Sequence, residues 1–210
     1  MVSIVKSKSP RPQTGEPAWD IARLFPLQGY WDEGDYLALG TNHLVEFTDG
    51  RIEVLAMPKP AHQRIVLYLC DEIRAFVRPE KLGEALIAPM PVRLRARKYR
   101  EPDVMFMLAK HAKRKSADYW KGADLVMEVV SDDDESRRRD HKQKREDYAA
   151  AGIPEYWIVD PATATITVLS LHRGEYRTHG EFKKKQRATS VLLAGFSVEV
   201  GEVFGAATAP

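Results

Sequence analysis

The feature that most restricts the fold is an apolar run in the middle of the chain, from Asp124 to Val130. Between these ends, Leu125-Val126-Met127-Glu128-Val129-Val130 holds one polar residue, Glu128. A strand that is apolar at nearly every position is typical of the centre of an α/β sheet, where helices cover both faces. No apolar stretch approaches the ~20 residues that span a bilayer. The sequence therefore predicts an α/β fold with a mixed β-sheet flanked by helices, and no membrane partner.

The neighbouring elements follow from apolar spacing and turn residues. Helical spacing predicts a helix over 62–77, which Pro79 ends, and a highly charged stretch predicts a second long helix over 136–151, which Gly152 stops. The pair Asp49-Gly50 favours a tight hairpin turn. A short helix is expected over 31–39. Strands are expected over 44–47, 51–55, 85–88, 91–94, 103–108, 155–159, 166–171, 175–179 and 197–200, with extra hairpins towards both ends of the chain.

Length and composition set the domain organisation. A chain of 210 residues with 44% hydrophobic residues is sufficient for one domain with a substantial core. Residues 1–28 lack sustained periodicity and are expected to form a flexible arm, followed by a single domain over 29–204 and a tail over 205–210. The single cysteine, Cys70, excludes an internal disulfide and a cysteine-rich zinc site. The expected setting is reducing and cytoplasmic.

Basic residues are concentrated in one part of the chain. The total of 32 Lys and Arg against 30 Asp and Glu gives a net charge of only +2. Residues 93–121, however, contain ten basic and three acidic side chains. Such a stretch fits contacts with a phosphate backbone, and it equally fits solvated strand ends and loops. The residues proposed as DNA contacts are Arg97, Lys98, Arg100, Lys113, Arg114 and Lys115.

Two carboxylates occupy positions that suggest chemistry. Glu128 interrupts the central apolar strand, and a carboxylate is rarely buried unless it is paired, protonated or bound to a metal. Asp103 follows Pro102 at the start of another apolar strand. Acidic residues at corresponding ends of neighbouring strands would form an oxygen-rich pocket suited to Mg²⁺ or Mn²⁺. A salt bridge at Glu128 and an ordinary turn at Asp103 are the alternatives.

A lysine lies further along the chain on the predicted charged helix. Asp140, Lys144 and Tyr148 are spaced by four residues, so they share one helix face. From that face, Lys144 could reach a phosphate or an attacking water. The alternative is a salt bridge on a solvated helix.

A series of motifs extends these observations over most of the chain. In order they are Glu46 before Asp49-Gly50, Met57-Pro58 then His62, Glu101-Pro102-Asp103-Val104, Glu128-Val129-Val130-Ser131, Asp140 with Lys144 and Tyr148, and Gly152-Ile153-Pro154-Glu155-Tyr156-Trp157-Ile158-Val159-Asp160-Pro161. This order resembles the Uma-two family of restriction endonucleases, a branch of the PD-(D/E)xK nuclease superfamily, over roughly residues 31 to 200. The resemblance implies a restriction-endonuclease-like core and metal-dependent hydrolysis of DNA phosphodiester bonds.

The resemblance also implies roles for individual residues. Asp103 matches the Asp of the superfamily and Glu128 its second acid, so these two side chains and the Val129 carbonyl are the expected ligands of Mg²⁺ or Mn²⁺. The superfamily normally carries a lysine two residues after the second acid, where this chain has Val130. Lys144 resembles a lysine that has migrated to the following helix. Glu46, His62 and Asp140 are the expected accessory residues.

The charge of the substrate explains why such a site is useful. A cation offsets the negative phosphate oxygens and lowers the pKa of water. Lys144 would orient the nucleophile or stabilise developing charge, and no general base stands out. Because Val130 replaces the usual lysine, an alternative function is a catalytically weak domain that binds nucleic acid or a protein partner.

Self-association is a further expectation. Cutting both strands of a duplex usually requires two active sites, and this chain has one candidate. The predicted strands 166–171 and 175–182 offer apolar edges that could pair across a two-fold axis. The alternative is that they cover the core of the same subunit. A homodimer is the prediction.

Overall fold

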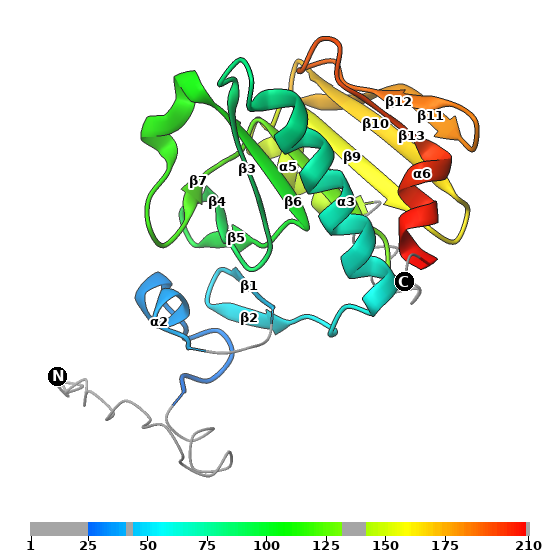
Figure 1. Cartoon of the computed structure of the whole chain (residues 1–210). Coiled ribbons are helices and arrows are strands. Elements are labelled where there is room, and N and C mark those ends of the chain that lie inside the picture. Colours follow the sequence, from blue (N-terminus) through cyan, green and yellow to red (C-terminus); the bar gives the residue numbers. More distant parts are fainter. Residues whose placement is uncertain (1–24, 41–43, 132–141, 209–210) are drawn as a thin grey trace, which may run out of the picture.

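A six-stranded mixed sheet forms the centre of the fold (Figure 1). A computed structural model describes residues 25–40, 44–131 and 142–208. The central sheet contains, in spatial order, β11 (Glu175–Lys183), β10 (Thr165–His172), β9 (Glu155–Asp160), β8 (Leu125–Val129), β6 (Val104–Leu108) and β3 (Gly83–Ile87). Only β8 and β9 pair in parallel, and the other neighbours are antiparallel. The predicted mixed sheet is confirmed.

Strand β8 is buried on both faces, as its apolar run predicts. Leu125 and Met127 belong to the core that α3 (Pro60–Val77) forms on one side of the sheet. Val126 belongs to the core on the other side, together with Tyr148 of α5 (Lys144–Ala150). Each large aliphatic side chain buried in this way contributes about 1.5–3 kcal/mol. The two helices therefore hold β8, and with it Glu128, in the middle of the fold.

A second sheet packs beside the first and was not predicted as a separate unit. Its five strands are, in spatial order, β2 (Arg51–Val54), β1 (Val45–Thr48), β5 (Lys98–Arg100), β4 (Val92–Arg95) and β7 (Trp120–Lys121). Helix α2 (Glu33–Leu37) covers it through Tyr36, which stacks on Phe47 with 5.5 Å between ring centroids. The predicted turn is confirmed, because Asp49 and Gly50 both have positive φ, at 48° and 89°.

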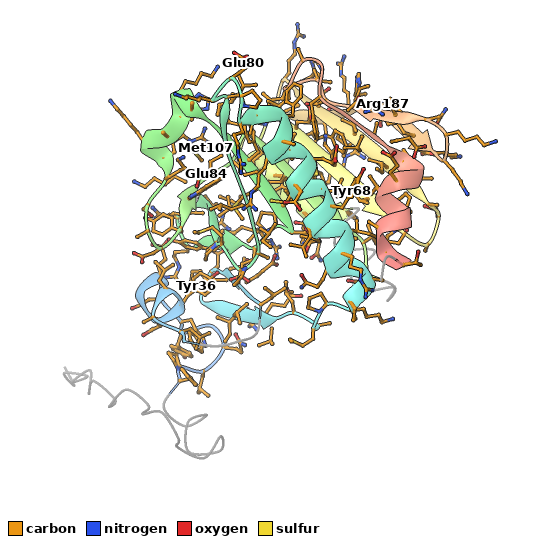
Figure 2. All side chains as sticks on the ribbon, in the orientation of Figure 1. Tyr36, Tyr68, Glu80, Glu84, Met107 and Arg187 are labelled. Atoms are coloured by element: carbon orange, nitrogen blue, oxygen red, sulfur yellow. The ribbon has the colours of Figure 1, made fainter. Side chains whose placement is uncertain are left out.

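The C-terminal part closes over α3. Strands β12 (Arg187–Thr189) and β13 (Ser197–Glu199) form a two-stranded sheet, followed by α6 (Val200–Gly205) and the 3₁₀ helix η3 (Ala206–Thr208). Tyr68 is on α3 (Figure 2), and its hydroxyl donates to Glu202 of α6 at 3.3 Å. Arg64 donates to the Ala207 carbonyl oxygen at 3.3 Å. These contacts attach the end of the described chain to the helix that flanks the central sheet.

Most predicted elements are present, with several corrections. Helix α3 begins two residues earlier than expected, because Pro60 fits the first helical turn. The strand predicted to reach residue 200 ends at Glu199, where the side chain caps α6 by accepting from the Glu202 N–H. Among the described residues, sequence spacing missed six short elements: β5, β7, β12, α6, η3 and the 3₁₀ helix η1 (Ala109–Arg114). They are too short to carry a periodic signal.

Two further predictions concern the charged helix over 136–151 and the apolar edges of the C-terminal hairpin. Of the predicted helix 136–151, the structure describes α5, and residues 132–141 lie outside the described part. Strand β10 lies between β9 and β11, so β11 alone of that hairpin is an edge strand.

Within the described ranges, none of the helices has the length and apolarity needed to cross a bilayer. The division into an arm (1–28), a domain (29–204) and a tail (205–210) stays a prediction.

Candidate functional site

The predicted acidic residues meet at one end of β6 and β8. The antiparallel register pairs Val104 with Met127, so Asp103 lies directly across from Glu128 on the neighbouring strand. They line a pocket of about 40 Å³. Its polar lining also includes His62, Glu101, Ser131 and Lys144. The pocket is large enough for water molecules or a small ion.

Lys144 and Tyr148 hold the two oxygens of Glu128. The Lys144 Nζ donates to Glu128 Oε2 at 2.7 Å, and the Tyr148 hydroxyl donates to Glu128 Oε1 at 2.5 Å. The side chains of Glu128 and Lys144 are only 2% and 4% exposed. Lys144 and Tyr148 are four residues apart on α5, so both reach β8 from one helix face, as their spacing predicts. Asp140, the third residue of that spacing, lies outside the described residues.

Asp103 is held from two sides. Its Oδ2 accepts from the backbone N–H of Val129 at 2.7 Å, and it lies 3.3 Å from His62 Nε2. The same His62 nitrogen donates to the Val129 carbonyl oxygen at 3.0 Å. His62, on the first turn of α3, therefore contacts both the carboxylate and the carbonyl that the family resemblance implies as metal ligands.

The surroundings of His62 favour its charged form. Burial by itself lowers the pKa of His62, but the hydrogen bond and negative charge of Asp103 act in the opposite direction. The Val129 carbonyl and the charge of Glu128 add to that effect, and the net result is a raised pKa.

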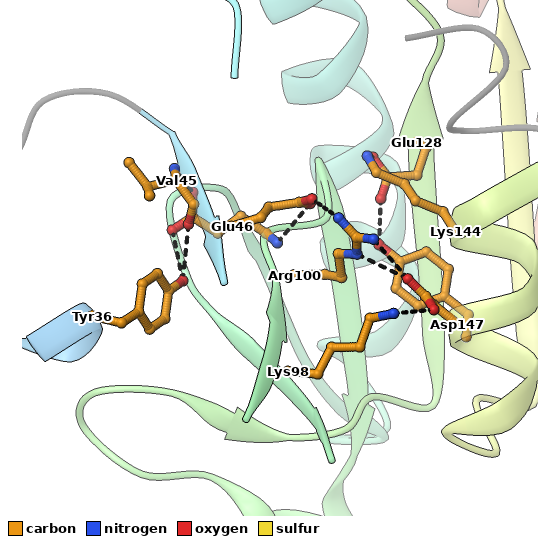
Figure 3. A network of polar contacts seen from close by, with 10 residues as sticks. Tyr36, Val45, Glu46, Lys98, Arg100, Glu128, Lys144 and Asp147 are labelled. Carbon is orange, nitrogen blue, oxygen red and sulfur yellow. Dashed lines mark hydrogen bonds and ion pairs between the residues drawn. The ribbon is translucent and has the colours of Figure 1, made fainter. Parts of the chain in front are cut away.

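Glu46 belongs to a neighbouring polar network (Figure 3). The buried guanidinium of Arg100 on β5 forms ion pairs with Glu46 of β1 and Asp147 of α5. Lys98 forms a second ion pair with Asp147. Glu46 is not among the described residues that line the pocket. The network ties the second sheet to α5, one turn away from Lys144.

Glu101 lines the same pocket and was not assigned a role from the sequence. Its carboxylate accepts from the Val45 N–H at 3.1 Å and from the Tyr36 hydroxyl at 3.4 Å. Burial raises the pKa of Glu101 to about 7, and the negative charge of Glu46 acts in the same direction. Its position two residues before Asp103 in Glu101-Pro102-Asp103 is the one sequence signal that could have identified it.

The residues proposed as DNA contacts fall into two separate groups. Lys98 and Arg100 form the ion pairs just described, and Arg97 donates to the Trp31 carbonyl oxygen at 3.3 Å. Arg114 and Lys115 lie at the opposite end of β6 from Asp103, where Lys115 pairs with Glu84 at 2.7 Å. Lys113 is exposed on η1. Their role in DNA binding stays a prediction.

The oxygen donors of the pocket fit a hard divalent cation. Asp103 and Glu128 supply carboxylates, and Val129 supplies a carbonyl, which are the ligand types that Mg²⁺ and Mn²⁺ prefer. Across 25–40, 44–131 and 142–208, no three His, Cys, Asp or Glu side chains are grouped as a metal site. The carbonyl and water would therefore have to complete the coordination.

The fold and the pocket define a class of α/β protein with two acids and a lysine at one end of a mixed central sheet. The model of the Uma2 family, described as "Putative restriction endonuclease", matches residues 31–201, and the chain belongs to this family. A solved structure described as a putative nuclease belonging to DUF820, from Anabaena variabilis ATCC 29413, is similar with a TM-score of 0.68. The two chains are 17% identical over 87% of this chain and 99% of the other, a level that supports the fold alone. None of the curated proteins matches the chain.

Proposed function

We propose that this protein hydrolyses phosphodiester bonds of DNA with the help of Mg²⁺ or Mn²⁺. The observation that carries the proposal is the 2.7 Å contact between Lys144 Nζ and Glu128 Oε2 in the pocket that Asp103 also lines. Two acids and a lysine in one pocket are the side chains that metal-assisted phosphoryl transfer requires. Membership of the Uma2 family supports the same reaction.

Three groups of the pocket would hold the cation: the carboxylates of Asp103 and Glu128 and the carbonyl oxygen of Val129. When bound, the cation supplies positive charge next to the phosphate and lowers the pKa of water. The positions of these ligands are fixed by the protein itself. His62 holds Asp103 and the Val129 carbonyl, and Tyr148 holds Glu128.

Lys144 is the residue that would act on the substrate. Its ammonium group donates to Glu128 Oε2 and lines the pocket, so it would be next to a phosphate oxygen or the attacking water held there. In a buried pocket, such a positive charge stabilises the negative charge that develops on phosphate more strongly than it would in water. Lys144 takes the place of a lysine at position 130, where Val130 packs in the core instead.

The proposal also includes the contacts with DNA and the formation of a homodimer. The basic residues Arg97, Lys98, Arg100, Lys113, Arg114 and Lys115 are the proposed contacts with the DNA backbone. A homodimer would bring two such pockets to the two strands of a duplex. Strand β11 is one of the two edge strands of the central sheet, and two copies would pair through it.

Cleavage assays with matched variants test the reaction. Plasmid, short duplexes and single strands are incubated with Mg²⁺ or Mn²⁺, with and without EDTA. We expect metal-dependent cleavage that Asp103→Asn and Glu128→Gln abolish, while the control Glu80→Gln, at an exposed position between α3 and β3, retains it. Cleavage that survives in the Asp103→Asn, Glu128→Gln double variant would overturn the proposal. Salt-sensitive DNA binding without cleavage or metal affinity would identify a binding domain instead.

A further inference from the structure

A larger, mainly apolar pocket adjoins the acidic one. Its volume is about 220 Å³, and it shares Leu44, Pro58, His62 and Asp103 with the acidic pocket. The remaining walls are Met57, Gln63, Val66, Ile87, Ala88 and Pro89. We call it the apolar pocket. Its position matters because Asp103 and His62 form a common wall, so a ligand can occupy both pockets at once.

We infer that the apolar pocket binds one unstacked nucleobase of the DNA strand whose phosphate is cleaved. This inference rests on the proposed function, since the acidic pocket is where the phosphate would lie. A nucleotide has the matching composition, with an anionic phosphate joined through a sugar to a flat ring that has apolar faces and polar edges. The acidic pocket would hold the phosphate with its cation, and the adjoining apolar pocket would hold the base.

The walls of the apolar pocket suit a base ring. Pro58 and Pro89 contribute rigid rings, and Met57 and Ile87 contribute flexible and branched aliphatic surface. Enzymes that take a base out of the stack hold it between aromatic or apolar side chains and read its polar edge with hydrogen bonds. Met57 is 64% exposed, so its thioether is accessible to such a ligand. A thioether is polarisable and packs well against π-systems.

Gln63 provides the polar group that such a site needs. It lies on the first turn of α3, its side chain is exposed, and it lines the apolar pocket. Its amide has two donors and an acceptor, which match the mixed donors and acceptors on the edge of a base. A predominantly apolar pocket with a few placed polar groups is the usual composition of a small-ligand site.

The arrangement limits the form of the DNA. A base stacked inside a duplex cannot enter a side pocket while its own phosphate lies at Asp103. The base must leave the stack, which costs least in single strands, at mismatches and next to damaged positions. The expected substrates are therefore single-stranded or distorted DNA, in preference to regular duplex.

Binding of a fluorescent base tests the inference without relying on cleavage. Single strands carrying one 2-aminopurine, an adenine analogue whose emission rises when it unstacks, are titrated with the Glu128→Gln protein in Mg²⁺. We expect emission to change at one position of the strand only. Ala88→Phe, which fills the apolar pocket, and Met57→Ala, which removes an exposed wall, should each weaken this binding, the first by at least about tenfold. The control Ala117→Phe adds the same ring at an exposed position and should have no effect.

Abasic scanning separates this inference from the proposed function. Each base of a cleavable single strand is removed in turn, and cleavage by the wild-type protein is measured. We expect loss of one base next to the cut bond to slow cleavage by the wild type at least about tenfold. The Ala88→Phe protein should cleave the intact and the abasic strand at the same rate. If no base removal changes the rate of cleavage, the inference that the apolar pocket binds a base is wrong, and the proposed nuclease function still holds. Position-specific fluorescence without cleavage supports the pocket and overturns the nuclease.

Discussion

The hydroxyl of Tyr148 donates to Oε1 of Glu128 at a distance of 2.5 Å, and Lys144 donates to the other oxygen, Oε2, at 2.7 Å. Burial comes first among the causes that raise the pKa of Tyr148, and the charge of Glu128 acts in the same direction. The phenol therefore keeps its proton and remains a donor. One helix face thus fixes both oxygens of the carboxylate in the central strand.

Removing the phenol hydroxyl should loosen Glu128. We expect Tyr148→Phe to lower the free energy of unfolding by about 1.5–3 kcal/mol, the range for a hydrogen bond to a charged group. Urea unfolding at neutral pH measures this change. Tyr119→Phe serves as the control, because Tyr119 is only partly buried. A Tyr148→Phe protein as stable as the wild type would contradict the assigned contact.

Replacing the buried lysine should affect both stability and reaction. Lys144→Met leaves Glu128 without its ammonium partner, which costs roughly 3–5 kcal/mol for a buried pair. If Lys144 acts on the phosphate, the rate constant of cleavage should fall by about 10²–10³. Rates are compared at a temperature where circular dichroism shows both proteins folded. Tyr148→Phe also destabilises the protein but keeps the lysine, so it separates the two effects.

The Arg100 network should be worth more than an exposed ion pair. Arg100 is buried between Glu46 and Asp147, so Arg100→Met leaves the buried Glu46 without its ion-pair partner and Asp147 with Lys98 alone, which should cost about 3–5 kcal/mol. Arg95 and Asp49 form an ion pair with side chains 53% and 54% exposed. Arg95→Met should cost less than about 1 kcal/mol. Equal losses of unfolding free energy in the two variants would show that the buried network is not a structural support.

The raised pKa of Glu101 predicts how stability changes with pH. The carboxyl has an ordinary pKa of 4.5 and a folded pKa of about 7, so the folded state binds the proton more tightly than the unfolded state. Its contribution is present below pH 4.5 and is lost as the pH rises to about 7, by an amount on the order of 3 kcal/mol.

Comparison with an amide isolates this contribution. Glu101→Gln retains an acceptor for the Val45 N–H but cannot ionise. Unfolding free energies of both proteins are measured in EDTA between pH 4 and 8. We expect the free energy of unfolding of the wild type to fall relative to that of Glu101→Gln as the pH rises. A difference that stays constant over this range would mean that Glu101 ionises freely in the folded protein.

The central strand and its partners were predictable because local sequence determines them. The apolar run around Glu128 requires burial on both faces, and the spacing of Lys144 and Tyr148 places both on one helix face. The positions of Asp103 and Glu128 in two apolar strands suggested that they meet, the resemblance to a known family implied their roles, and the strand register agrees with the meeting.

The ion pairs of Arg100 and the apolar pocket were not predictable in the same way. Arg100 lies 54 residues from Glu46 and 47 from Asp147. Contacts over such separations depend on how the two sheets pack, and no periodic pattern reports this packing. For the same reason, a basic stretch that suggested a nucleic-acid surface contains side chains that pair within the protein.

The lysine on a helix has a consequence for how related proteins are recognised. When acid and lysine share a strand, they must be two residues apart, because alternate side chains face the same way. Here Lys144 reaches Glu128 from α5, so the number of residues between them depends on the connecting segment and can vary among relatives. A search that demands a fixed spacing would overlook such proteins. A search for an acid in a buried strand, followed by a lysine four residues before a tyrosine on a helix, would find them.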